Sequence, residues 1–140
     1  MEVKSRSSRQ KGRWIAVAAW AALIFLLSSM PGSMLEPLPT FLGWDKLGHM
    51  ILYGALGVLL YRAVETKRFT PWLIWLFCVV YGLTDELHQY WIPGRFADVS
   101  DLVADAVGAA AALFWWNHHA KVVMRKNAAG NYSDIDNTIG

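Results

Sequence analysis

The chain has 140 residues, of which 55% are hydrophobic and only 17% are charged. Soluble domains average about 25% charged residues, so this composition argues against an ordinary soluble protein, and the length allows one domain. The single cysteine, Cys78, excludes an intramolecular disulfide and a cysteine-based metal site.

The chain opens with a basic tail, residues 1–13, which holds five Lys or Arg against one acid, Glu2. An uncharged run, 14–30, follows at once. A helix that is apolar all round belongs in lipid or in a large protein core, and 140 residues cannot build such a core. Nucleic-acid binding is the rival interpretation of the tail, but the adjoining apolar run favours a membrane and no nucleic acid. A cleaved signal peptide is disfavoured, because its apolar region spans about 7–15 residues.

Three further apolar runs predict helices at about 45–64, 70–88 and 99–117. Each is near the short end of the about 17–25 residues that span a bilayer. Tryptophans fall at the predicted ends, as in the aromatic belts of membrane proteins: Trp14, Trp44, Trp72, Trp91, Trp115 and Trp116. We therefore predict an all-α fold, an integral membrane four-helix bundle over residues 14–117, followed by a polar tail, 118–140.

Basic residues predict the orientation of this bundle. Eleven of the 13 Lys and Arg lie in the first tail, the middle loop or the last flank, and two, Lys46 and Arg95, lie in the other two loops. The positive-inside rule places the Lys- and Arg-rich side in the cytoplasm. Both tails are thus expected to be cytoplasmic (N-in/C-in) in a multi-pass membrane protein.

Ten polar residues gather at the predicted outer helix ends, and we call them the polar cluster: Asp45, Lys46, His49, Tyr53, Glu86, Gln89, Arg95, Asp98, Asp101 and Asp105. Asp98, Asp101 and Asp105 share one helix face, because they are three and four residues apart. A charge inside a span costs about 2.5–3.5 kcal/mol on insertion scales, so such groups normally face the bundle and pair there. Interfacial anchoring could explain Asp45, Lys46 and Asp98.

Catalysis and metal binding are both chemically open for the polar cluster. His49 and Glu86 are candidates for a general acid/base pair, although no nucleophile stands out. Asp98, Asp101 and Asp105 are candidate ligands of a divalent metal, since carboxylates suit such ions. Acids at a helix start also favour the helix dipole, so their spacing alone decides nothing.

Two stretches carry a resemblance to a known family. They are DKLGHMILYGALGVLLYR and YGLTDELHQYWIPGRFADVSDLVADAVGAAAA, which contain Asp-Lys-x-x-His-x-x-x-Tyr, Gly-x-x-x-Glu-x-x-Gln, Pro-Gly-Arg and Asp-x-x-Asp. Over about residues 15–116 the chain resembles the VanZ-like family, which is named for a protein associated with teicoplanin resistance. Asp105 is a departure, because the family often has Asn there. The resemblance implies a role in the bacterial envelope and supplies no reaction.

Three functions follow as hypotheses for a protein of the bacterial inner or cytoplasmic membrane. The first is binding of an anionic lipid or a lipid-linked cell-wall precursor at the polar cluster, with Lys46 and Arg95 as anion contacts and a link to glycopeptide (teicoplanin) tolerance. The second is a metal-assisted membrane enzyme that acts on envelope lipids. The third is a small transporter subunit with Glu86 and Asp105 in a polar path. No motif decides the oligomeric state.

Overall fold

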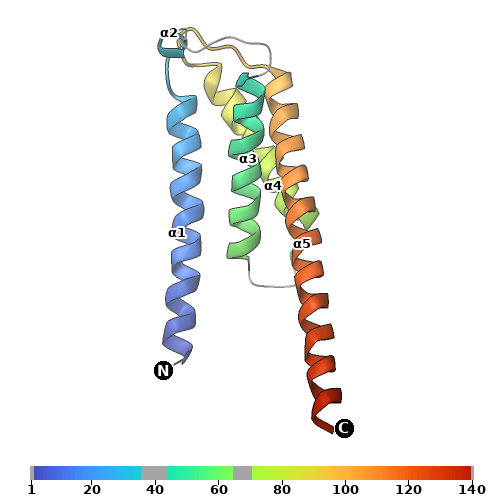
Figure 1. Cartoon of the computed structure of the whole chain (residues 1–140). Helices are drawn as coiled ribbons and strands as arrows, with labels where there is room; N and C mark the ends of the chain where they lie inside the picture. Colours follow the sequence, from blue (N-terminus) through green and yellow to red (C-terminus); the bar gives the residue numbers. More distant parts are fainter. Residues whose placement is uncertain (1, 36–43, 65–70, 140) are drawn as a thin grey trace.

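The computed structural model describes residues 2–35, 44–64 and 71–139, and side chains within 7–34, 45–64 and 71–119. Every regular element in this part of the chain is a helix: α1 (Glu2–Ser28), α2 (Gly32–Leu35), α3 (Trp44–Ala63), α4 (Pro71–Gln89) and α5 (Val99–Ile139). The four long helices run side by side, with the N- and C-termini at the same end (Figure 1). The predicted all-α class is confirmed.

The helix bounds agree with the sequence in the middle of the chain and differ at both ends. Pro71 opens α4, where its missing N–H is not needed. The first helix begins at Glu2 instead of near residue 14, and the last continues to Ile139 instead of ending near 117. Neither terminal segment contains a proline, so nothing in the backbone ends the helix where the hydrophobic run ends. The short α2 was not predicted.

Small residues bring α3 and α5 into close contact, and this pair forms the most extensive helix interface of the chain. A Cβ added at Gly54 would lie 3.1 Å from the Gly108 carbonyl oxygen and 3.3 Å from the Ala112 Cβ. A Cβ at Gly108 would overlap the backbone carbonyl of Met50. The two backbones can therefore approach closely only because these residues are small.

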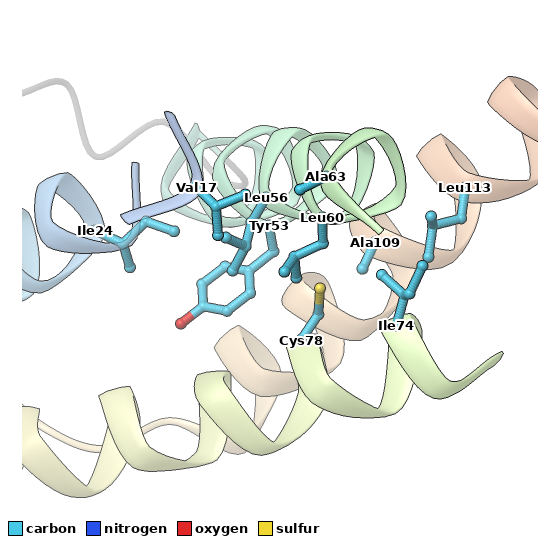
Figure 2. Close-up of a cluster of buried hydrophobic side chains, with 10 residues drawn as sticks. All are labelled: Val17, Ile24, Tyr53, Leu56, Leu60, Ala63, Ile74, Cys78, Ala109 and Leu113. Carbon is cyan, nitrogen blue, oxygen red and sulfur yellow. The ribbon is translucent and has the colours of Figure 1, made fainter. Parts of the chain in front are cut away.

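An apolar cluster fills the middle of the bundle. Its buried side chains come from all four long helices (Figure 2): Val17, Ile24, Tyr53, Leu56, Leu60, Ala63, Ile74, Cys78, Ala109 and Leu113. Burial at about 25 cal/mol per Å² would hold them together in water, but in lipid the helices associate through packing and hydrogen bonds. Tyr53 belongs both to this apolar cluster and to the polar cluster.

Aromatic side chains supply hydrogen bonds between helices. Each donates to a backbone carbonyl of another helix: Trp20 Nε1 to Leu52 at 2.9 Å, Trp75 Nε1 to Ala106 at 2.9 Å and Tyr81 Oη to Ala21 at 2.9 Å. Buried Trp and Tyr normally find such partners. These bonds link α1 to α3, α4 to α5, and α4 to α1.

Two helical segments of the described chain are long and apolar enough to cross a membrane, Ser7–Ser28 and Val99–His119. The other two long helices, α3 and α4, have 20 and 19 residues and carry charged residues near their ends. The sequence predicts four membrane spans, of which α3 and α4 would be the second and the third.

Candidate functional site

Three helix ends bring the polar cluster together. α3 begins, α4 ends and α5 begins at the end of the bundle opposite the two termini, which we call the polar end (Figure 1). The cluster therefore combines residues up to 60 positions apart, from Asp45 to Asp105. Its members divide into an exposed layer around Lys46 and a buried layer around Glu86 and Asp105.

Lys46 is the centre of the exposed layer. Its ammonium lies 3.2 Å from the Asp45 carboxylate and 3.0 Å from that of Asp98, and it also donates to Asp101. Exposed pairs of this kind stabilise a fold by about 0–1 kcal/mol each. Lys46 was predicted to contact an anion, but three carboxylates already surround its charge.

Asp98 caps the start of α5. Its carboxylate accepts hydrogen bonds from the Ser100 hydroxyl at 2.7 Å and the Ser100 backbone N–H at 2.8 Å. The Ser100 contacts and the Lys46 ammonium lower the pKa of Asp98 to about 2, so it stays ionised at any physiological pH. Ser100 is thus occupied as part of a helix cap, which does not favour it as a nucleophile.

The buried layer contains carboxylates that water barely reaches. Asp105 is 0% exposed and Glu86 is 4% exposed. His49 Nδ1 lies 3.0 Å from Asp105 Oδ1, and Glu86 Oε2 accepts the backbone N–H of Asp98 at 2.8 Å. These contacts join all three helices, since His49 belongs to α3, Glu86 to α4 and Asp105 to α5.

Gln89 links the buried layer to Arg95. Its amide nitrogen donates to Asp85 at 3.3 Å, and its amide oxygen accepts from the Arg95 guanidinium at 2.7 Å. No carboxylate of the described residues lies within 4.0 Å of Arg95, whereas Lys46 has three. Arg95 therefore forms no ion pair within this part of the chain.

A tight turn presents Arg95. Gly94 has a φ of +74°, which favours glycine over residues with a Cβ. The Gly32 N–H donates to the Pro93 carbonyl at 3.1 Å, and the Arg95 N–H closes the turn onto Ile92 at 3.1 Å. The Pro-Gly-Arg motif thus builds a fixed turn next to the buried layer.

Two buried atoms of the polar cluster have no hydrogen-bond partner among the described residues, Asp105 Oδ2 and Tyr53 Oη. Figure 2 shows the Tyr53 oxygen turned away from Leu60, Ile74 and Cys78. A Cβ at Gly82 would lie 2.8 Å from Asp105 Oδ2 and 3.4 Å from Tyr53 Cε1. Both side chains therefore converge on α4 at Gly82, one turn before Glu86.

The structure groups a different set of metal-ligand candidates from the one that the sequence suggested. Asp98 and Asp101 face Lys46, while His49, Glu86 and Asp105 each offer a ligand atom within 4.8 Å of the others. Of the predicted metal candidates, only Asp105 belongs to this set. His49 and Glu86, predicted as an acid/base pair, therefore lie where they could also bind an ion.

Two further residues contribute to the polar end although they do not belong to the predicted polar cluster. Asp85 is buried beside Gln89, and Ser29, the residue that follows α1, has its hydroxyl 3.0 Å from His88 Nε2. The Phe25 ring stacks on His88 with centroids 4.6 Å apart. No pattern in the apolar run of α1 could have indicated these contacts, because they depend on how α1 packs against α4.

The family model VanZ/LLP1 matches residues 13–120 of the chain. The chain belongs to the VanZ/LLP1 family. No curated protein and no solved structure matched. The matched region of this VanZ/LLP1 chain contains the whole polar cluster and all four long helices in part or in full. The resemblance of the sequence to the VanZ-like family is thereby confirmed.

Proposed function

We propose that the chain is a multi-pass protein of the bacterial cytoplasmic membrane that binds an anionic, lipid-linked head group at its polar end. Membership of the VanZ/LLP1 family and two helices long enough to cross a bilayer support a membrane protein. With α3 and α4 as further spans, the helices form a four-helix bundle. Both termini lie at the end opposite the polar cluster, which agrees with an N-in/C-in orientation (Figure 1).

Reporter fusions test this orientation. An alkaline phosphatase fused after residue 140, or before residue 1, is expected to be inactive, because this enzyme needs the oxidising outer compartment. A green fluorescent protein fused at either end is expected to fluoresce. Phosphatase activity at both tails would overturn the N-in/C-in proposal.

Arg95 is the observation that carries head-group binding. Its guanidinium is held by the Gln89 amide, whose residue is 2% exposed, and has no carboxylate neighbour among the described residues. Arginine can bind phosphate with two parallel N–H donors, so a positioned and uncompensated guanidinium suits a phosphorylated head group. Lys46 is left out of this role, because Asp45, Asp98 and Asp101 already compensate its charge.

Arg95→Gln is expected to weaken phosphate binding. A hydrogen bond to a charged group contributes about 1.5–3 kcal/mol, which corresponds to a loss of affinity of about tenfold to a hundredfold. Isothermal titration calorimetry of the detergent-purified protein with a short-chain polyprenyl phosphate measures this loss, and the uncharged polyprenol shows whether the phosphate is required.

Arg62→Gln is the matched control, since Arg62 lies at the other end of α3, over the Trp116 ring. It should bind the phosphate as the unsubstituted protein does. Equal affinity of the unsubstituted and Arg95→Gln proteins would contradict the proposal. If the natural head group is a cell-wall precursor, teicoplanin susceptibility should also differ between cells with and without the chain.

A metal-assisted enzyme acting on the same head group is the second candidate function. The convergence of His49, Glu86 and Asp105 favours it, because these residue types can both bind an ion and move a proton. Turnover of the polyprenyl phosphate that requires a divalent ion would support the enzyme, and binding without turnover would support the binding protein.

A further inference from the structure

We propose that His49, Glu86 and Asp105 bind one divalent transition-metal ion, Mn²⁺ or Zn²⁺, inside the polar end of the bundle. The three side chains come from three different helices and place a ligand atom each within 4.8 Å of one another. This site goes beyond the head-group proposal, because it stands whether or not a lipid binds at Arg95.

Buried carboxyl groups outnumber the neighbouring cations in the described part of this region. Asp85, Glu86 and Asp105 are at most 6% exposed, and His49 can contribute at most one positive charge. Leaving a buried charge without compensation costs several kcal/mol, so such groups are normally paired or bind a metal. Lys46 does not offset these carboxyl groups, since it already pairs with Asp45, Asp98 and Asp101.

Two buried atoms in this region have no hydrogen-bond partner among the described residues. Asp105 Oδ2 is fully buried without a hydrogen bond, and so is the Tyr53 hydroxyl. When the carboxylate is ionised, an oxygen in this state lacks a donor or a cation. Gly82 leaves room for Asp105 Oδ2 on the face of α4 that also bears Glu86, and a Cβ there would lie only 2.8 Å from it.

The neighbours of these residues hold them in place for such a role. Glu86 Oε2 is fixed by the Asp98 backbone N–H at 2.8 Å, and His49 Nε2 lies 3.8 Å from Asp101 Oδ2. Metal-binding histidines usually interact with a carboxylate through the second ring nitrogen. One imidazole with two carboxylates suits Mn²⁺ or Zn²⁺ better than Mg²⁺ or Ca²⁺, which prefer oxygen ligands alone.

Metal titration of the full chain in detergent tests this site. After treatment with a chelator, the protein is expected to bind one equivalent of Mn²⁺ or Zn²⁺ by isothermal titration calorimetry, and more weakly Mg²⁺. Asp105→Asn and His49→Gln should each lower the affinity at least about a hundredfold, since even a neighbour of a ligand is worth about 10–100-fold. Bound Mn²⁺ should also show nitrogen coupling in pulsed electron paramagnetic resonance, lost in His49→Gln.

Two further variants separate loss of the ion from loss of the fold. Asp45→Asn removes an exposed carboxylate of the same polar cluster and should keep the ion. Gly82→Ala keeps all three ligands but adds a methyl group against Asp105 Oδ2, and should weaken binding at least tenfold with unchanged helical circular dichroism. Absence of binding by the unsubstituted protein would overturn the proposal. Equal affinity of the folded Asp105→Asn and unsubstituted proteins would also overturn it.

Discussion

Glu86→Ala is expected to weaken head-group binding at least tenfold and to destabilise the protein. The Glu86 carboxylate accepts the Asp98 N–H at 2.8 Å and a longer bond, 3.5 Å, from Gln89, which itself holds Arg95. Alanine removes the acceptor, and an unsatisfied donor costs about 1–3 kcal/mol. The turn that presents Arg95 should therefore loosen. Calorimetry with polyprenyl phosphate and thermal unfolding in detergent measure the two effects.

Glu86→Gln separates geometry from charge in the same position. The glutamine side chain keeps a carbonyl oxygen for the Asp98 N–H, so phosphate binding and thermal stability should stay close to those of the unsubstituted protein. Its affinity for a divalent ion should fall, because a carboxylate ligand is lost. A Glu86→Ala protein that binds phosphate with unchanged affinity and unfolds at an unchanged temperature would show that Glu86 does not organise the polar end.

Gly108→Ala is expected to lower the unfolding temperature more than any other single methyl addition on α3 or α5. The new Cβ would overlap the Met50 backbone carbonyl, which cannot rotate away as a side chain can. Overpacking of this kind costs about 1–3 kcal/mol, and here it must move α3 relative to α5. Thermal unfolding in detergent, followed by circular dichroism, measures the change.

Gly48→Ala is the control for this substitution. Gly48 also lies in a helix, but a Cβ there meets nothing within 4 Å. Alanine is favoured over glycine in a helix by about 1 kcal/mol, so this variant should be as stable as the unsubstituted protein or more stable. An unfolding temperature of Gly108→Ala that is no lower than that of Gly48→Ala would contradict the described contact between α3 and α5.

Local sequence features predicted much of this fold. The apolar runs predicted helices at about 45–64 and 70–88, close to the bounds of α3 and α4. An apolar run is a property of one segment, so it can be identified without knowledge of the partner helix. The terminal extensions of α1 and α5 were not predicted, because these segments are polar. The ends of the apolar runs therefore do not coincide with the ends of the helices.

The contacts of the polar cluster could be predicted only in outline. Helical spacing predicted that Asp98, Asp101 and Asp105 share one helix face. It could not show that Lys46 pairs with Asp98 and Asp101 while His49 contacts Asp105. Which side chains pair depends on the position of α3 relative to α5 along the bundle axis. Helix depth and rotation are set by tertiary packing, which a single sequence does not contain.

The natural occupant of the polar end is the most direct test of this account. Native mass spectrometry of the detergent-purified protein, beside Arg95→Gln and Arg62→Gln, would detect a lipid that copurifies. We expect a phosphorylated lipid on the unsubstituted and Arg62→Gln proteins that is lost or depleted in Arg95→Gln. Spectra without such a lipid, or with the same lipid at equal occupancy in all three proteins, would contradict head-group binding at Arg95.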